Sequence, residues 1–341
     1  MICFIWSGFP QYAARCVGAF VTHSKEKCIV VATRPKVPVE GMEQLCGCKV
    51  IWIGSECKET LRNLVGELPN IAIIDGWGVP VFNRFRDEVL DGGGRTYAMV
   101  DNNFVFSVKE MIKALRFRLF LRRKYSAYLV PGNSGVRLLK FYGVDKQKIF
   151  KGMYAADASL FNSTTHLANR EKRILFVGQF CDRKNVLSLV KAFLQVSTDV
   201  RYGWTLELCG CGPQKNMIPK DSAVIVHDFV QPEILAAIYR NARVFCLPSK
   251  EEHWGLVVHE AALSGCYLLL SRQVGAAMDF VGPHNGVLFD ATNMDELVKS
   301  IVRAMNLTQD QLFMAEHESI EKSKMASISQ FVDSCRNMIT N

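Results

Sequence analysis

The chain has 341 residues, of which 49% are hydrophobic, so we expect two globular domains that are each large enough to bury a core. No apolar run is long enough to span a bilayer, and no internal repeat or low-complexity segment is present. The formal net charge of +8 is uneven, because residues 1–166 carry +9 and the remainder carries −1. This excess either reflects a partner of the first half or arises by chance.

The twelve cysteines are scattered, and several fall in or beside apolar strands, so we expect reduced thiols of a cytosolic protein rather than disulfides. Two Cys-x-Cys pairs, Cys46 with Cys48 and Cys209 with Cys211, lack the usual zinc spacing, and we assign no metal site. The N-terminus has no basic stretch ahead of an apolar one, and Pro10 interrupts it early, which argues against a signal peptide.

Short apolar runs that predict buried strands alternate with helical patterns through the first half. The runs are 2–6, 29–31, 50–53, 71–74, 96–100 and 128–130. This alternation predicts a doubly wound parallel sheet, which binds ligands at the carboxyl ends of its strands. Four loops at these ends are candidates for ligand contacts, although each taken alone is more typical of an ordinary turn. The loops are 7–10, which contains Gly8, then 75–78, then 101–103, which begins with Asp101, and 133–134.

A polar and irregular stretch follows the first half and predicts a connection between two domains. The expected domains are residues 1–152 and 170–325, joined by a linker at 153–169. Residues 326–341 predict a C-terminal helix.

The second half repeats the alternation of strands and helices. Its runs are 173–177, 204–208, 224–226, 244–247, 267–270 and 286–289. The turn that contains Gly210 and Gly212 mimics a dinucleotide-binding fingerprint, but Pro213 and the missing third glycine weaken that interpretation.

The stretch 244–265 predicts a strand, a loop and a helix, and Gly255 opens the helix. Amide groups around Trp254, Gly255 and Leu256 belong to the first helical turn, where they lack intrahelical partners. They favour an anion such as a diphosphate.

Two carboxylates lie on this stretch, Glu252 in the loop and Glu260 in the helix, with seven residues between them. Glu260 lies among apolar residues and needs partners, and a pair of ligand hydroxyls would serve. The alternative is that Glu260 pairs with a buried Arg or Lys and that Glu252 is a solvated loop charge. The spacing alone does not choose between the two.

The sequence Glu-His-Trp-Gly-Leu-Val-Val-His-Glu from Glu252 to Glu260 resembles the Glu-x7-Glu signature of family 4 glycosyltransferases. The resemblance implies the α/β GT-B fold, in which two Rossmann-like doubly wound domains face each other across a cleft. In that family the first domain binds the acceptor, the second binds a nucleotide-sugar, and a C-terminal helix crosses back to the first. The first Glu contacts sugar hydroxyls and the second holds the ribose of the donor.

The resemblance extends over about residues 170–305. The loop from Gly178 to Lys184 resembles the phosphate loop of the family, in which the lysine suits a diphosphate. Gln179 stands where the family has an arginine, so either Arg183 reaches the phosphates or they are held with one cation fewer.

The resemblance also implies the roles of individual residues. The catalytic residues would be Glu252, Lys184 and Asp101, the last because Asp101 stands where the family often has a histidine. The donor-binding residues would be Gly8, Gln179, Arg183, Lys184, Gly210, Phe229, Val230, Glu252, His253, Trp254, Gly255, Leu256 and Glu260.

The activity implied by the resemblance is transfer, with retention of configuration, of a hexose or N-acetylhexosamine from a UDP- or GDP-sugar. The sequence contains no Asp-x-Asp, so we expect no metal and no other cofactor. One alternative is a nucleotide-sugar epimerase or hydrolase on the same fold. Another is a non-catalytic nucleotide-sugar binding protein, to which the replaced arginine and histidine give some weight, but the retained Glu252, Gly255, Glu260 and Lys184 weigh more. A Rossmann oxidoreductase that uses NAD is more distant.

A basic helix is predicted at about 107–124. Its cations are Lys109, Lys113, Arg116, Arg118, Arg122, Arg123 and Lys124. Its apolar stripe is Ile112, Leu115 and Leu119, and Phe117, Phe120 and Leu121 add bulk beyond one core-facing strip. Such a helix suits an anionic membrane surface, at about 1 kcal/mol per cation near the lipid. The alternative is a solvated helix whose basic end complements its dipole, and nucleic acid is not expected because no binding motif accompanies the charge.

Many members of the family extend lipid-linked sugars at the inner face of the bacterial membrane. We therefore expect a cytoplasmic enzyme, peripheral on the inner face of the cell membrane, with a lipid-linked or oligosaccharide acceptor. The expected process is surface polysaccharide assembly, such as that of the O-antigen of lipopolysaccharide or of capsule. The residues assigned to the membrane or acceptor are Lys109, Lys113, Arg116, Arg122 and Arg123.

Overall fold

The computed structural model describes residues 1–35, 39–54 and 56–340, and the chain divides into two compact units. The first unit contains Met1–Ala155 and the C-terminal segment that begins at Ser327, and the second unit is Ala156–Ala326. The stretch 153–169, predicted as a linker, is thus divided between the two units, and two of its apolar side chains, Met153 and Leu167, are buried. In the part of the chain that the structure describes, no helix is long and apolar enough to cross a membrane.

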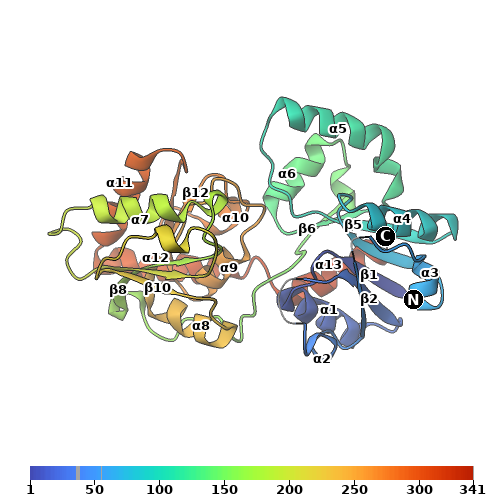
Figure 1. The fold of residues 1–341 in the computed structure, drawn as a ribbon, viewed down its shortest axis with the longest axis horizontal. Coiled ribbons are helices and arrows are strands. Elements are labelled where there is room, and N and C mark those ends of the chain that lie inside the picture. The colour runs from blue at the N-terminus through green and yellow to red at the C-terminus, as the bar shows by residue number, and fades with distance from the viewer. Residues whose placement is uncertain (36–38, 55, 341) are drawn as a thin grey trace. The chain divides into compact units, whose positions relative to one another are not determined.

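The first unit is built on a seven-stranded parallel sheet with the order β3-β2-β1-β4-β5-β6-β7. Strands β1, β2, β5 and β6 of this sheet are labelled in Figure 1. Its strands are β1 (Ile2–Trp6), β2 (Cys28–Thr33), β3 (Lys49–Ile53), β4 (Ile71–Asp75), β5 (Arg95–Met99), β6 (Tyr128–Val130) and β7 (Ile149–Lys151). The first six lie where apolar runs predict them, since a strand covered on both faces is apolar throughout. Strand β7 has no predicted counterpart, because three residues that end in a lysine carry too little pattern.

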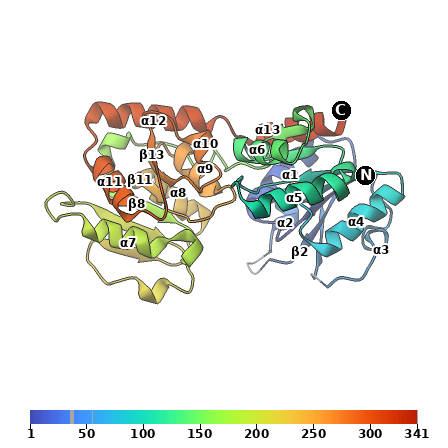
Figure 2. The same cartoon turned by 90° about the horizontal axis from the view of Figure 1, so that it is seen from above.

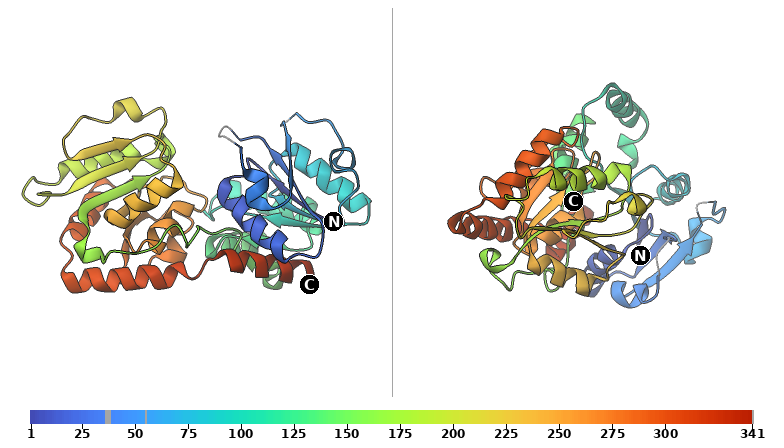
Figure 3. Two further views of the ribbon diagram at one scale, coloured as in Figure 1. Left: turned by 90° about the horizontal axis from the view of Figure 1, so that it is seen from below. Right: turned by 60° about the vertical axis from the view of Figure 1, so that its left-hand side comes forward.

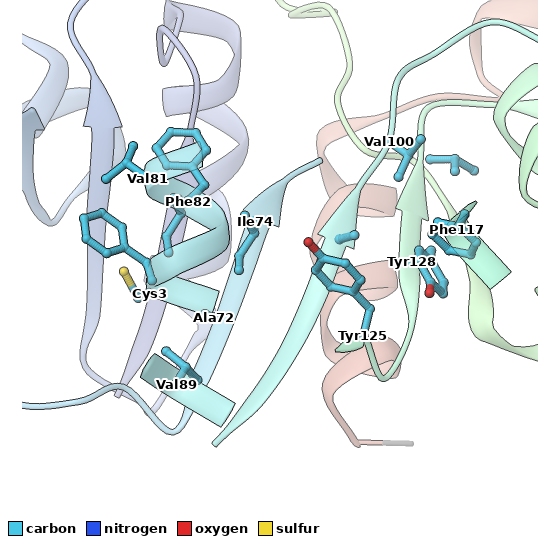
Figure 4. Packing of buried hydrophobic residues seen from close by; sticks show 14 of the residues in the cluster. Cys3, Ala72, Ile74, Val81, Phe82, Val89, Val100, Phe117, Tyr125 and Tyr128 are labelled. Atoms are coloured by element: carbon cyan, nitrogen blue, oxygen red, sulfur yellow. The ribbon is translucent and has the colours of Figure 1, made fainter. Parts of the chain in front are cut away.

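The helices of the first unit cover both faces of this sheet. They are α1 (Gln11–His23), α2 (Met42–Cys46), α3 (Leu61–Val65), α4 (Pro80–Asp91), α5 (Val108–Phe120), α6 (Asn133–Phe141) and α13 (Ile328–Thr340), with 3-10 turns η1 (Arg122–Lys124) and η2 (Lys146–Lys148). Side chains of α3 to α6 share one buried cluster with the sheet, in which Phe82, Phe117 and Tyr128 are large members (Figure 4). Helix α5 begins where Ser107 accepts a hydrogen bond from the N–H of Glu110 at 3.1 Å.

The C-terminal helix α13 packs against α1 within the first unit (Figure 3). The ring of Phe331 lies 6.5 Å from the ring of Phe4. Arg336 donates a hydrogen bond to the carbonyl oxygen of His23 at 2.6 Å. The end of the chain therefore completes the unit that its beginning forms.

The second unit is built on a six-stranded parallel sheet with the order β10-β9-β8-β11-β12-β13. Its strands are β8 (Glu171–Val177), β9 (Thr205–Cys209), β10 (Val224–His227), β11 (Ala242–Leu247), β12 (Tyr267–Ser271) and β13 (Gly286–Phe289). Its helices are α7 (Val186–Gln195), α8 (Pro232–Asn241), α9 (Leu256–Leu263), α10 (Ala277–Phe280), α11 (Met294–Met305) and α12 (Gln309–Ser323), with 3-10 turns η3 (Leu167–Asn169), η4 (Asp182–Lys184) and η5 (Lys215–Met217). Helices α7 and α11 pack on one face, and α8, α9 and α12 pack on the other (Figure 2).

In both sheets the order in which strands are added reverses at the first strand, because β1 lies between β2 and β4, and β8 lies between β9 and β11. Such a place in a sheet is called a topological switch point. The loops that leave the two neighbouring strands at a switch point, β1 and β4 or β8 and β11, turn to opposite faces of the sheet. The carboxyl edge between them is where α/β proteins bind ligands. The prediction of two doubly wound α/β domains is confirmed.

Candidate functional site

The loops after β8 and β9 meet at the switch point of the second unit. Gly178, Gly210 and Gly212 adopt φ angles of 154°, 153° and 151°. A Cβ on Gly210 would lie 1.9 Å from the carbonyl oxygen of Gly178, and one on Gly212 would lie 2.4 Å from that of Phe180. Only glycine permits this contact, so the two glycines after β9 support the loop that leads to Lys184.

Lys184 and Glu252 form a buried ion pair at this point. Lys184 Nζ donates a hydrogen bond to Glu252 Oε2, and the two residues are 9% and 8% exposed. Arg183 Nη1 lies 3.6 Å from the same oxygen and donates to the carbonyl oxygen of Glu251 at 2.9 Å. The alternative that Glu252 is a solvated loop charge is therefore wrong. Two cations face one carboxylate, and the three groups sum to a positive charge that suits an anion.

The loop that carries Glu252 is braced by the segment 273–276. The N–H of Glu252 donates to the carbonyl oxygen of Gln273 at 3.3 Å, and the N–H of Gly275 donates back to that of Glu252 at 3.1 Å. A Cβ on Gly275 would lie 1.9 Å from the carbonyl oxygen of His253, so only glycine fits. Sequence reasoning missed Gly275, since its backbone neighbour cannot be recognised from the chain alone.

Gly255 turns the chain from this loop into α9. It has a φ of 90°, and a Cβ there would lie 3.2 Å from Cγ of Glu252. Helix α9 begins at Leu256, so the N–H groups of its first turn lie near Glu252 and carry the positive end of the helix dipole. Trp254 is buried, with its ring 5.9 Å from that of Phe280. Its side chain belongs to the core, and only its backbone can contact a ligand.

Glu260 is held by a tyrosine rather than by an Arg or Lys. The hydroxyl of Tyr239, on α8, donates to Glu260 Oε2 at 3.0 Å. Burial raises the pKa of Glu260 to about 7, although the hydrogen bond from Tyr239 favours the ionised form. Burial and the charge of Glu260 raise the pKa of Tyr239. The carboxyl group therefore changes its charge near neutral pH. Sequence reasoning missed Tyr239, because it lies on another helix.

The remaining predicted donor residues are more exposed. The side chains of Gln179, after β8, and Phe229, after β10, are exposed, and Val230 is half-buried. The imidazole of His253 lies 3.8 Å from the carboxylate of Glu251. These residues follow strands that end at the same sheet edge, but the ion-pair cluster contains only Arg183, Lys184 and Glu252 from the predicted set.

In the first unit, Asp101 lies near a second carboxylate, Asp75, which opens one of the predicted ligand loops but has no role assigned by the resemblance. Asp75 ends β4 and accepts a hydrogen bond from the N–H of Ser7 at 3.1 Å. Burial, and then the charge of Asp101, raise the pKa of Asp75 to about 7. Gly8 has a φ of 64° and donates to Thr33 Oγ1 at 2.9 Å. The signal that points to Asp75 is its place at the switch point between β1 and β4.

Helix α5 turns its apolar stripe toward solvent. Ile112, Leu115 and Leu119 are 65%, 59% and 66% exposed. The buried side chains of α5 are Ala114 and Phe117. The prediction that Phe117 is surplus to the core-facing strip is therefore wrong, because Phe117 faces the core and the stripe of Ile112, Leu115 and Leu119 does not.

The cations predicted on the helix at 107–124 fall into two groups, and Arg122, Arg123 and Lys124 lie on η1 rather than on α5. Those assigned to the membrane or acceptor, Lys109, Lys113, Arg116, Arg122 and Arg123, are exposed. Lys113 is also paired with Glu110 on its own helix, at 3.0 Å, whereas the remaining two cations have partners on other elements. Arg118 donates to the carbonyl oxygen of Phe141 at 2.7 Å, and Lys124 donates to Asp87 at 2.9 Å.

Residues 161–319 match the family model described as Glycosyl transferases group 1. An uncharacterized glycosyltransferase of Methanocaldococcus jannaschii is 25% identical over 154 residues, which make up 43% of this chain and 39% of the length of that protein. The crystal structure of HepE from Anabaena in complex with UDP and glucose covers 100% of this chain and 99% of its own, with a TM-score of 0.77 and 12% identity. The apo form of the lipopolysaccharide outer core galactosyltransferase WaaB covers 99% of each chain, with a TM-score of 0.70 and 15% identity. The fold is GT-B.

The match to the group 1 glycosyltransferase model falls almost wholly within the second unit of this GT-B chain. The matched range contains the ion pair of Lys184 and Glu252 and also Glu260. Asp75 and α5 lie outside that range. The part of the chain that resembles the group 1 model is therefore the part that holds the candidate donor site.

Proposed function

We propose that this chain is a glycosyltransferase that moves a hexose or an N-acetylhexosamine from a UDP- or GDP-sugar to a saccharide acceptor. The observation that carries the proposal is the convergence of Lys184, Glu252 and the first turn of α9 at the switch point of a group 1 domain. A cation and a helix N-terminus bind a diphosphate, and a carboxylate accepts hydrogen bonds from sugar hydroxyls.

The ion pair gives both of its members a role in binding the donor. A diphosphate at the first turn of α9 offers Lys184 a second anionic partner, with Arg183 at the edge of the same cluster. Glu252 then keeps acceptor positions for hydroxyls of the transferred sugar, because a carboxylate has about four of them. In this arrangement Arg183 supplies the second cation that Gln179 cannot.

Glu260 is the proposed ribose-binding group. Tyr239 engages Oε2, and no described residue hydrogen-bonds to Oε1, which is left to accept from the ribose hydroxyls. A rigid tyrosine contact also fixes the carboxylate in one orientation, so less freedom is lost when the donor binds.

Cleavage of the donor places negative charge on the leaving nucleoside diphosphate. Lys184, Arg183 and the dipole of α9 are available to stabilise that charge, and their effect grows toward the transition state. The proposed reaction therefore uses no divalent ion. Retention of configuration, with the acceptor hydroxyl attacking the face from which the diphosphate leaves, is carried over from the resemblance to family 4.

The proposed acceptor is a lipid-linked saccharide, and the proposed location is the cytoplasmic face of the membrane. The exposed apolar stripe of α5 and its exposed cations support this part, since anionic lipid can satisfy both. The similarity of fold to WaaB, named as a lipopolysaccharide outer core galactosyltransferase, favours a role in surface polysaccharide assembly.

A panel of UDP-, GDP- and dTDP-sugars tests the donor proposal by thermal shift. A donor at 100 times its dissociation constant should stabilise the protein by about 2.7 kcal/mol. Candidate saccharides, with and without a lipid anchor, then test for acceptor-dependent release of the nucleoside diphosphate. Turnover of the donor without any acceptor would indicate an epimerase or hydrolase. Tight binding with no turnover would indicate a non-catalytic binding protein.

A further inference from the structure

A cavity of about 690 Å³ lies between α5 and the loop that follows β4 in the first unit. One wall is the face of α5 that carries Lys113, Arg116, Phe117 and Phe120. These positions recur at helical spacing, so they form a continuous stripe along the helix. Trp77 and Tyr142 also line the cavity. We call this cavity the α5 groove.

The floor of the α5 groove is aromatic and fixed in place. The ring of Trp77 lies 4.9 Å from that of Phe117 and 6.4 Å from that of Tyr142. Asn83 holds the loop by donating to the carbonyl oxygen of Trp77 at 3.0 Å. Phe120 lines the same groove, yet its side chain is exposed. An apolar chain laid on these rings would remove apolar surface from water.

Two cations stand at the rim of the groove. Lys113 lies 3.0 Å from Glu110, whose other carboxylate oxygen accepts a hydrogen bond from Tyr142. Arg116 has no ion pair or hydrogen bond to another described side chain. The three charges sum to +1, and Lys113 and Arg116 are one helical turn apart on the same face, so both can reach a single phosphate.

The groove adjoins the exposed apolar face of α5. Ile112 and Leu119 lie on that face, and Ile112 is one turn away from Arg116. A lipid chain that leaves the groove along α5 therefore stays against apolar side chains. A water-soluble phosphate would use the cations and leave both apolar surfaces exposed.

From this geometry we propose that the α5 groove binds one lipid phosphate, with its phosphate on Lys113 and Arg116 and the first part of its chain on Trp77 and Phe120. The α5 groove would then bind the lipid anchor of the acceptor, an assignment that rests on the proposed function.

Farnesyl phosphate tests the groove without donor, vesicles or turnover. Titration of the full chain, followed by calorimetry and by tryptophan fluorescence, should show saturable binding of one molecule. Farnesol lacks the phosphate and inorganic phosphate lacks the chain, so each should bind at least tenfold more weakly. Arg116→Ala removes a charged hydrogen-bond donor and should weaken binding roughly tenfold or more. Phe120→Ala, at an exposed side chain, should weaken it as well.

The matched control is Lys140→Ala, which removes one exposed cation of α6 outside the groove and should bind as the wild type does. Thermal unfolding of each variant checks that it is folded. Equal affinity for farnesol and farnesyl phosphate, or unchanged affinity in Arg116→Ala, overturns the proposal. Binding only to phosphatidylglycerol vesicles, and not to farnesyl phosphate, overturns it too and indicates surface adsorption. If the protein transfers sugar but does not bind farnesyl phosphate, the groove proposal alone is overturned. If the protein binds no nucleotide-sugar, the proposed function is overturned.

Discussion

The second unit buries charged side chains, whereas the first unit exposes apolar ones. In the second unit the charged groups are drawn inward and matched, Lys184 with Glu252 and Glu260 with Tyr239. In the first unit α5 turns apolar side chains outward, and Arg116 faces solvent. A site for a small charged ligand is complete within its own fold, because buried charges must be paired. A surface for a larger apolar partner is completed only by that partner.

The largest effect is expected from breaking the matched charges of the second unit. Lys184→Ala removes the cation proposed to stabilise the leaving diphosphate and should lower kcat about 100- to 1000-fold, the usual result of losing one transition-state donor. Donor affinity should fall less, because the charge on the diphosphate grows during the reaction. Steady-state kinetics measures both. Lys191→Ala, at an exposed lysine of α7, is the control. A kcat for Lys184→Ala within threefold of the wild-type value would show that the lysine is not catalytic.

His259 gives a second way to break the internal pairing. This buried imidazole accepts a hydrogen bond from the N–H of Ala156 at 3.0 Å on Nδ1, and its Nε2 lies 3.0 Å from the carbonyl oxygen of Ser323, to which the neutral ring donates. Burial lowers its pKa to about 4 from 6.5. The unfolded chain therefore takes up the proton first as pH falls, so stability contributed by the neutral ring is lost between pH 6.5 and about 4.

The size of this loss follows from the shift in pKa, at about 1.4 kcal/mol per unit, and is roughly 3 kcal/mol. Other groups titrate in the same range, so the measurement is a difference. Urea unfolding of the wild type and of His259→Gln should show a stability gap that narrows as pH falls from 7 to 4.5. A gap that stays constant over this range would mean that the imidazole does not titrate in the native protein.

Much of this contrast could be anticipated from the sequence, and the part that could not has a physical cause. Buried parallel strands leave continuous apolar runs, so both sheets could be placed. The partners within the sites could not, because Lys184 and Glu252 are 68 residues apart and neither loop specifies the other. On α5 both stripes are apolar, and the choice of the core-facing one is made by contacts such as that between Phe117 and Trp77, which spacing along the helix does not reveal.

Glu260 combines a hydrogen bond from Tyr239 with the proposed contact to the ribose of the donor. Glu260→Ala should weaken donor binding by about 1.5–3 kcal/mol, since the ribose loses a charged acceptor. With a raised pKa of about 7, the wild-type carboxyl is largely protonated below neutrality, so donor affinity should rise as pH increases through 7. Calorimetric titration of wild type and Glu260→Gln from pH 6 to 8 measures this, and the rise should be absent from the variant. An equal rise in both proteins would assign the pH effect to another group.

The exposed cations of the first unit should each make a small contribution to vesicle binding, and these contributions should add together. Sedimentation with vesicles that contain phosphatidylglycerol should show binding that decreases with salt. Neutralising Lys109, Arg122 or Arg123 singly should reduce it by about 1 kcal/mol each, the value of one cation near anionic lipid. Lys220→Ala, at an exposed lysine of the second unit, should have no effect. Equal sedimentation with neutral and anionic vesicles would remove the electrostatic part of the membrane proposal.

The last prediction is that removing divalent metal ions leaves the transfer rate unchanged. It tests whether the proposed reaction requires a metal ion. Arg183 and Lys184 lie beside one carboxylate, where a transferase that uses a divalent ion needs several oxygen ligands. Across the described ranges, no group of three or more His, Cys, Asp or Glu is arranged to hold a metal ion. We predict that transfer continues at an unchanged rate in excess EDTA, measured by release of the nucleoside diphosphate, because Arg183 and Lys184 can supply positive charge at the proposed diphosphate position. If EDTA abolished transfer and manganese restored it, the charge on the leaving group would have to be balanced by an ion, and the two cations would serve only to bind the donor.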